Sequence, residues 1–256
     1  MAVTTLIDPH VLDRYPWFLP WEHTGKDILQ AWQQHPTALH ACLAKQQTVF
    51  QAVSQDELPS DEAYEVFIAR TQTVPTRNNA HDFFNGLCWL RFPQTKRQLN
   101  RLQAQAIQKE GVTAQRGALR DALTLFDENA ALLCAPDVLW QALKRQDWQA
   151  LFVTNREAWK DAHLTLFGHA LLEKLLKPYK GITAHVLCVS VPTEVQAAGD
   201  TGLDTWLSNQ LDADAMQRKP FLPLPVLGVP GWWLANEDAG FYEDPKVFRP
   251  QKKQGY

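Results

Sequence analysis

The chain has 256 residues, of which 45% are hydrophobic and 21% are charged, and its formal net charge is −3. This balance is typical of a globular protein and excludes a disordered chain, which would combine low hydrophobicity with high net charge. The nearly neutral total also excludes a protein that binds polyanions through its overall charge.

The first 26 residues are rich in proline and aromatic side chains, which predicts an extended N-terminal arm whose rings adhere to the body of the protein. After this arm, helical spacing of apolar residues and proline at first-turn positions predict a series of helices. Their expected ranges are 27–35, 36–54, 61–71, 79–91 and 93–110.

The pattern changes after residue 120. Residues 122–135 contain two apolar runs around the polar stretch DENA, which predicts a β-hairpin. Further helices are expected over 136–159, 163–177 and 200–216, and a β-branched strand over 181–191. Residues from about 220 to 256 are punctuated by proline and predict an irregular C-terminal wrap.

Together these elements predict one domain over residues 1–256 with a mainly helical α+β fold. In this fold, a β-hairpin and at least one further strand pack against helices. No composition break, internal repeat or low-complexity tract marks a second domain.

Several classes of protein are excluded by motifs that the sequence lacks. It has no P-loop, no G-x-G-x-x-G turn, no H-E-x-x-H and no G-x-S-x-G. The four cysteines are too widely spaced for a disulfide framework or a thiolate zinc site, which indicates a reducing compartment. No stretch approaches the roughly 20 apolar residues of a membrane helix, and no secretory signal is visible, so we expect a cytoplasmic protein.

A polar stripe marks the predicted helix 79–91. His81, Asp82 and Asn85 lie on one side, with Trp89 next along the stripe, while the rest of the helix is apolar. Polar groups inside an apolar helix must find partners, which makes these three residues candidates for a functional site. Capping of the helix or bonding to a neighbouring loop explains them equally.

Two further histidines lie on apolar elements. His169 and Glu173 are one turn apart in the predicted helix 163–177, and His185 is on one face of the predicted strand. A histidine and a carboxylate in low dielectric suit proton transfer or a divalent metal, so these three residues form a candidate catalytic or metal-binding set. An ordinary surface pair for His169 with Glu173, and a core position for His185, are the alternatives.

Charged residues surround the predicted hairpin. We expect Arg116 and Arg120 to hold an anion and Asp121, just before the first strand, to act as a ligand or orienting carboxylate. An ion pair between Asp121 and Arg120 is the alternative. The segment 83–120 holds seven basic residues and one acidic residue, a net charge of +6. Such a segment either binds anions or is the solvated face of a helix.

Two hypotheses for function follow. The first is a hydrolase-like acid–base or metal-dependent enzyme acting on an anionic substrate. Its catalytic residues would be His169, His185, Glu173, His81 and Asp121, its substrate-binding residues Arg116, Arg120, Asn85 and Asp82, and its metal ligands His169, Glu173 and His185. The alternative is a non-catalytic protein that binds nucleic acid or a partner through the basic 91–120 surface.

Several long segments, taken together, identify a relationship. The segments HDFFNGLCWLRFPQTKRQLN, RDALTLFDEN and FGHALLEKLLKPYKGITAH, with LPLPVLGVPGWW and FYEDPKVFRP near the C-terminus, resemble the bacterial domain-of-unknown-function family numbered 3025. The resemblance covers most of the chain and implies a bacterial, single-domain protein. It implies no activity and assigns no catalytic residue.

Overall fold

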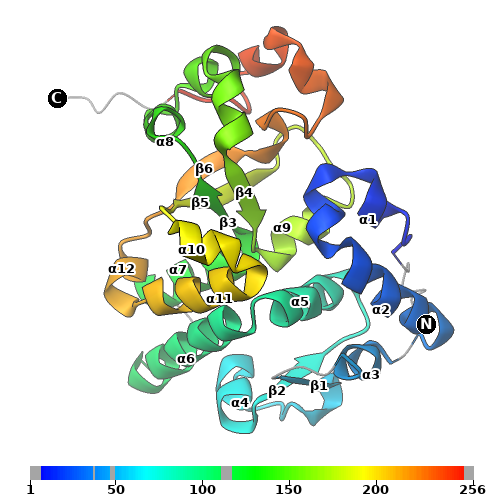
Figure 1. The fold of residues 1–256 in the computed structure, drawn as a ribbon. Helices are drawn as coiled ribbons and strands as arrows, with labels where there is room; N and C mark the ends of the chain where they lie inside the picture. The colour runs from blue at the N-terminus through cyan, green and yellow to red at the C-terminus, as the bar shows by residue number, and fades with distance from the viewer. Residues whose placement is uncertain (1–6, 37, 47–49, 111–116, 251–256) are drawn as a thin grey trace. The chain divides into compact units, whose positions relative to one another are not determined.

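The computed structural model describes residues 7–36, 38–46, 50–110 and 117–250 (Figure 1). By its internal contacts the chain divides into two compact units. Unit 1 comprises Met1–Glu128 and Pro192–Lys219, and unit 2 comprises Asn129–Val191 and Pro220–Tyr256. A single domain over the whole chain stays a prediction.

The N-terminal part of unit 1 is helical where an extended arm was expected. Its elements are α1 (Val11–Arg14), a 3-10 helix (Pro16–Trp21) and α2 (Glu22–Gln34). Pro16 begins the 3-10 helix, a position where proline loses no hydrogen bond. The rings of Trp17 and Phe18 are buried, so the expectation that the aromatic side chains adhere to the body is confirmed while the extended conformation is wrong.

A small parallel sheet follows in unit 1. Its elements are α3 (Leu39–Ala44), β1 (Gln51–Ser54), a short 3-10 turn (Gln55–Glu57), α4 (Tyr64–Thr71) and β2 (Thr73–Thr76). The two strands pair in parallel, with Ala52 opposite Val74, and α4 makes the crossover between them. The predicted helix 36–54 is therefore wrong in its last part, because pairing with a strand 22 positions later outweighs local helical spacing.

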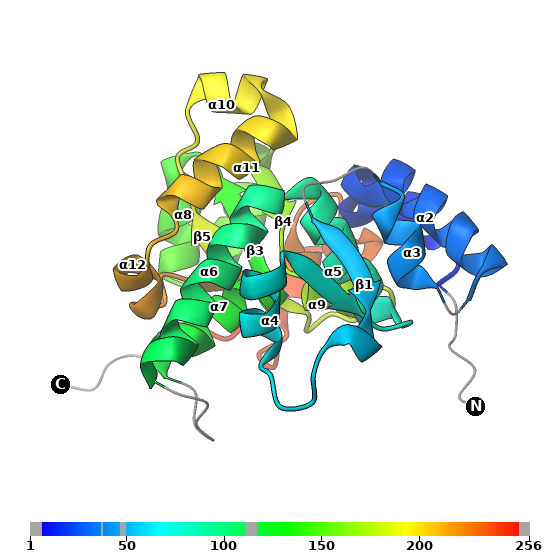
Figure 2. The same cartoon turned by 90° about the horizontal axis from the view of Figure 1, so that it is seen from below.

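Three helices follow in unit 1. They are α5 (Ala80–Arg91), α6 (Pro93–Glu110) and α7 (Ala118–Asn129), and α6 also packs against α4 (Figure 2). The helices predicted over 79–91 and 93–110 are confirmed. Asn79 caps the first of them, accepting a hydrogen bond from the backbone N–H of Asp82 at 2.7 Å.

The predicted β-hairpin over 122–135 is wrong. Its first half belongs to α7, where Ala122, Leu123 and Phe126 are buried at helical spacing, and only its second half is a strand. The polar DENA stretch, expected to turn between strands, ends the helix instead.

The last segment of unit 1 contains α10 (Thr193–Ala197), α11 (Gly199–Gln210) and α12 (Ala213–Gln217). The predicted helix 200–216 is thus interrupted before α12. Asp204 on α11 is 2% exposed and caps α6 from a distance: its carboxylate accepts hydrogen bonds from the backbone N–H groups of Gln94 (2.9 Å) and Thr95 (2.8 Å).

Unit 2 is built around a four-stranded sheet. In spatial order its strands are β4 (His163–Leu166), β3 (Ala130–Cys134), β5 (Thr183–Cys188) and β6 (Leu222–Pro225). The central pair, β3 and β5, is parallel and both outer pairs are antiparallel. The strand expected within 181–191 is confirmed.

The predicted helix 163–177 is wrong in its first part. Residues 163–166 pair with β3 as β4, and Gly168 separates them from the short helix α9 (His169–Lys174). Because β3 lies far away in sequence, this pairing leaves no local signal.

The remaining elements of unit 2 are short. Between the strands lie α8 (Asp137–Lys144), a π-helical turn (Ala150–Thr154) and a 3-10 helix (Arg156–Asp161). The C-terminal part has the edge strand β6 and 3-10 turns over Val226–Gly228, Leu234–Glu237 and Ala239–Glu243. The predicted wrap is thus irregular except for this one strand.

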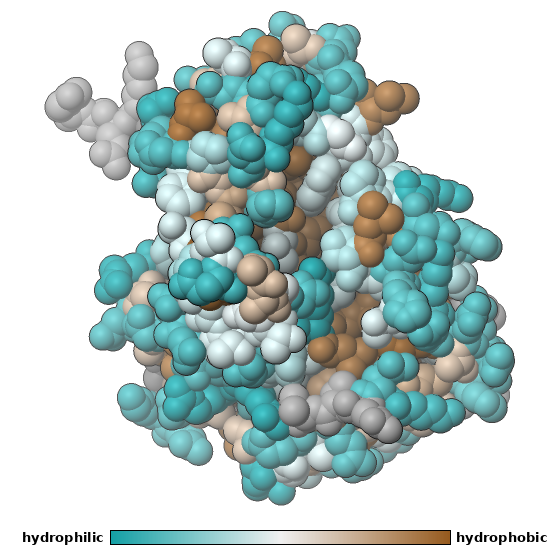
Figure 3. Space-filling view, in the orientation of Figure 1, coloured by the Kyte–Doolittle hydropathy of each residue, from teal (hydrophilic) through white to brown (hydrophobic). Residues whose placement is uncertain are grey.

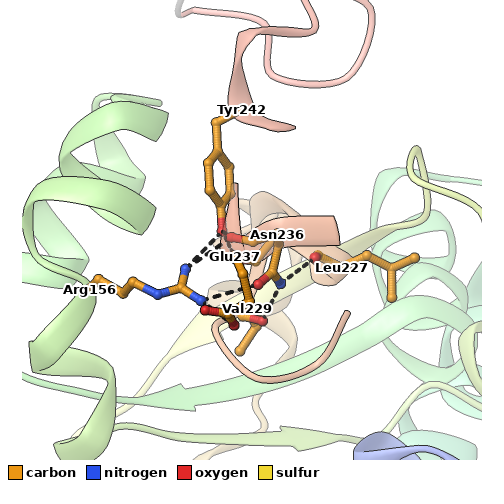
Figure 4. Close-up of polar contacts among 7 residues, drawn as sticks. Arg156, Leu227, Val229, Asn236, Glu237 and Tyr242 are labelled. Atoms are coloured by element: carbon orange, nitrogen blue, oxygen red, sulfur yellow. Dashed lines mark hydrogen bonds and ion pairs between the residues drawn. The ribbon is translucent and has the colours of Figure 1, made fainter. Parts of the chain in front are cut away.

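A polar network fixes the C-terminal turns (Figure 4). Asn236 donates from Nδ2 to the backbone oxygens of Leu227 (2.8 Å) and Val229 (2.7 Å). Arg156 donates from Nη1 to the backbone oxygen of Asn236 and to the hydroxyl of Tyr242, both at 3.2 Å. Because these side chains mainly donate hydrogen bonds to backbone carbonyls, we interpret the network as stabilising the C-terminal turns.

The mainly helical α+β class is confirmed. On the face drawn in Figure 3, hydrophilic side chains predominate, with several apolar patches among them. The large apolar side chains exposed in the described ranges are Leu19, Val138, Tyr179 and Leu234. Within those ranges no helix combines the length and apolar character needed to cross a membrane.

Candidate functional site

Asp82 and Asn85 of the polar stripe of α5 are buried in unit 1, and the carboxylate of Asp82 has a dedicated partner. Asp82 accepts hydrogen bonds from Arg77 at three points: the backbone N–H (2.6 Å), Nε (3.2 Å) and Nη2 (2.9 Å). With its own N–H bonded to the cap residue Asn79, Asp82 holds the loop before α5. The bonds of Asp82 therefore fit the alternative of helix capping and loop bonding. His81 lies in the same turn and is half-buried.

Asn85, the other buried residue of the stripe, belongs to a hydrogen-bond network that joins α5, α6 and α7. Lys96 is 3% exposed and donates from Nζ to Oδ1 of Asn85 (2.8 Å) and to Oδ1 of Asp127 (2.5 Å). Its ammonium also lies 5.5 Å from the ring centroid of Trp89. Asn85 in turn donates to the hydroxyl of Tyr64 (3.2 Å), whose pKa is raised by burial, so this phenol stays neutral. These groups satisfy one another and brace three helices.

The residues expected around the hairpin lie on α7 or outside the described residues. Asp121 is exposed on the helix, so the expectation that it enters a strand is wrong, while its role as a ligand or orienting carboxylate stays a prediction. Arg120 is buried, and within the described part of the chain its Nη1 has no hydrogen-bond partner. Arg116 lies outside the described residues.

The other candidates belong to unit 2. His169 begins α9 and is buried, and Glu173 follows one turn later, half-buried. His185 is on β5, on the less buried face that it shares with Thr183 and Leu187, as expected. Across the described ranges, no group of three or more His, Cys, Asp and Glu side chains is placed to hold a metal ion. His169, Glu173 and His185 therefore do not assemble the predicted metal site, and their catalytic roles stay predictions.

His185 gives a pH-dependent prediction. Burial, reinforced by the positive charge of Lys174, lowers the pKa of His185 below its usual 6.5. The unfolded chain therefore binds this proton more readily, and the associated stability is present above pH 6.5 and lost as pH falls through the lower pKa of the folded state. We expect His185→Gln to lose less stability than the wild type between about pH 7.5 and pH 5. Urea unfolding at both pH values measures this, with the exposed His163→Gln on β4 as control. Equal losses in the wild type and His185→Gln would contradict the assignment.

Unit 1 contains a cavity that the sequence did not locate. This α4–α6 pocket has a volume of about 440 Å³ and lies among α4, β2 and α6, with Phe50 and Trp89 in its walls. No carboxylate of the described residues lines it. Its polar lining consists of two guanidinium and four amide side chains: Arg97, Arg101, Gln72, Asn100, Gln105 and Gln108.

The helix α6 positions the two cations of the pocket. Arg97 and Arg101 are one turn apart on the exposed side of α6. The opposite side of this helix packs into the core with residues such as Leu99. Trp89 is held by the Lys96 ammonium at its ring and packs on Phe50, with ring centroids 5.3 Å apart. The pocket is therefore supported by packed residues from two helices.

The basic 91–120 surface is only partly available to a ligand. Arg91 makes a bidentate ion pair with Asp200 (2.8 and 2.9 Å), and Lys96 is used by Asp127. The exposed cations of α6 that line a cavity are Arg97 and Arg101. The basic run in the sequence indicated these two residues, whereas nothing in it indicated the amides beside them.

Comparison with known proteins places the chain in a family. Residues 50–252 match the model of the family described as "Protein of unknown function (DUF3025)". The chain belongs to the DUF3025 family. The match covers most of the chain and includes every residue that lines the α4–α6 pocket, and it confirms the resemblance expected from the sequence. Comparisons with curated proteins and with solved structures found no match.

Proposed function

We propose that this DUF3025 protein binds a small anionic ligand in the α4–α6 pocket. The observation that carries the proposal is the presence of two arginines, and no carboxylate, at a cavity of about 440 Å³. Guanidinium groups bind carboxylate and phosphate through paired hydrogen bonds, and pockets of this size hold small molecules. Apolar walls beside the arginines suit the uncharged part of such a ligand.

The two earlier hypotheses differ in how the structure bears on them. An anionic ligand is common to the enzyme hypothesis and to the binding alternative. In unit 1 the Lys96 ammonium lies at the ring of Trp89, a pocket residue, but it is engaged with Asp127, which favours binding over hydrolysis there. Hydrolase activity through His169, His185 and Glu173 remains a separate, untested proposal. An extended nucleic-acid surface is less favoured because Arg91 and Lys96 are already paired.

We also propose a cytoplasmic location in a bacterial cell. The four cysteines, all within the described residues, form no disulfide, and two of them, Cys42 and Cys88, are buried. Burial raises the pKa of Cys88 to about 12, so this thiol is unreactive. Such thiols support a reducing compartment.

Binding of inorganic phosphate to the full chain tests the proposed site. We expect titration calorimetry at constant ionic strength to show binding that Arg97→Gln and Arg101→Gln each weaken about tenfold, because each removes a charge-assisted contact worth at least about 1.5 kcal/mol. Lys109→Gln, an exposed cation on the same helix that does not line the pocket, should bind as the wild type does. Unchanged affinity in both arginine variants, or no binding of any anion, would overturn the proposal.

A further inference from the structure

Gln72 adopts a backbone conformation that is unfavourable for its side chain. It ends α4 with φ 59° and ψ 24°, the left-handed region that glycine adopts without steric cost. Its backbone N–H donates to the oxygen of Ile68 (2.8 Å), a helix-ending bond that any residue makes there. Glycine would therefore close this helix at least as well, whereas glutamine adopts this conformation at a steric cost, as Gln146 and Lys219 do elsewhere in the chain.

The side chain of Gln72 has hydrogen-bonding capacity left for a ligand. One N–H of its amide donates to the backbone oxygen of Ala69 (3.0 Å). A glutamine amide has a second N–H and an oxygen with two lone pairs. Gln72 is exposed and lines the α4–α6 pocket, so these groups are available at its surface.

The two arginines favour a phosphate monoester over a carboxylate. A phosphate monoester carries a charge of about −1.5 to −2 near pH 7 and three acceptor oxygens, whereas a carboxylate has one charge and two oxygens. Arg97 and Arg101 supply two positive charges, which match the charge of the phosphate, on planar groups whose geometry suits phosphate oxygens.

The rest of the pocket favours a planar heterocycle. Phe50, Trp89 and Val74 provide apolar wall, and the amides of Gln72, Asn100 and Gln105 provide donors and acceptors. Amide side chains pair with the edges of nucleobases, and aromatic rings contact their faces. The ligand class that combines a phosphate monoester with such a base is the nucleoside monophosphate.

We infer that the α4–α6 pocket takes a nucleoside monophosphate, with its phosphate at Arg97 and Arg101 and its base edge at Gln72. This inference rests on the proposed anion-binding function and specifies it. Gln72 is then the residue that distinguishes a nucleotide from other phosphate esters.

Calorimetry on the full chain with AMP, GMP, CMP, UMP, ribose 5-phosphate and adenosine tests the ligand class. We expect at least one nucleotide to bind ten or more times tighter than ribose 5-phosphate, and adenosine to bind weakly. If ribose 5-phosphate equals every nucleotide while Arg97→Gln weakens both, the nucleotide inference is overturned and anion binding stands. If no phosphate compound binds, both are overturned.

Gln72→Gly tests the specificity residue with two opposed readouts. The melting temperature should stay level or rise because strain is relieved, while affinity for the preferred nucleotide falls about fivefold and affinity for ribose 5-phosphate is unchanged. The matched control is Gln146→Gly in unit 2, where φ is 50° and the side chain is outside this pocket. It should relieve strain in the same way and leave nucleotide binding unaltered. A Gln72→Gly protein that is folded and binds the nucleotide like the wild type overturns the role of Gln72.

Discussion

Replacing Lys96 by methionine is expected to destabilise the protein by about 3 kcal/mol, because removal of one partner leaves a buried polar network unsatisfied. The substitution keeps most of the side-chain volume but leaves Oδ1 of Asn85 and the carboxylate of Asp127 without the ammonium that now binds both. Asp127 is 23% exposed, so water compensates part of the loss, and this places the effect at the lower end for buried ion pairs.

The urea midpoint followed by far-UV circular dichroism measures this effect. Lys109→Met is the control, because Lys109 is an exposed residue of the same helix, and we expect a change within about 0.5 kcal/mol. If Lys96→Met unfolds at the same midpoint as the control, the network does not brace α5, α6 and α7 as described.

Replacing Asn236 by alanine is the second large effect, a loss of about 2 to 3 kcal/mol from unsatisfied buried groups. Asn236 is 1% exposed, and its amide is the donor for the backbone oxygens of Leu227 and Val229. Alanine cannot donate to them, and water has little access at this depth. The side-chain oxygen of Asn236 also accepts from Nη2 of Arg156 (3.2 Å), which loses a partner as well.

The same network contains its own control. Glu237 accepts from Nη2 of Arg156 at 2.6 Å but is 57% exposed, so Glu237→Gln should change the unfolding free energy by less than about 1 kcal/mol. Thermal unfolding of both variants separates the two cases. A Glu237→Gln protein as unstable as Asn236→Ala would show that the exposed ion pair, and not the buried amide, holds the C-terminal turns.

The elements that were predicted correctly have local signals in the sequence. The helix α5 has apolar residues at helical spacing and is followed by Pro93, at which α6 begins, so both were found from the sequence. The strand β5 alternates buried and less buried residues, a pattern that no helix produces. In each case the hydrogen bonds or the periodicity that define the element lie within it.

The errors arose where partners distant in sequence decide the structure. β4 is a strand because it pairs with β3, and β1 because it pairs with β2; neither partner is visible from the strand itself. The apolar run of α7 fits a strand and a helix alike, and burial of Ala122, Leu123 and Phe126 on one side selects the helix.

In the candidate site, too, residues with a local signal were predicted and residues that depend on distant partners were not. The expectation that Asn85 is a buried polar residue in need of a partner is confirmed, but its partner Lys96 belongs to the basic segment, for which anion binding and a solvated helix face were the two interpretations. Arg97 and Arg101 were part of the basic run, whereas Gln72 became a candidate only through its backbone conformation and its position at a cavity. Neither property is encoded in a local pattern.

The cap that Asp204 provides for α6 has a consequence for synthesis of the protein. Thr95 leaves the ribosome 109 residues before Asp204, which at cellular rates of translation is a delay on the order of ten seconds. During that interval unit 2 residues 129–191 emerge while the start of α6 still lacks its acceptor. Unit 1 is therefore still incomplete when the first segment of unit 2 has been synthesised. Ribosome-bound chains stalled before residue 204 should be more sensitive to protease near Gln94 than chains stalled well after residue 219.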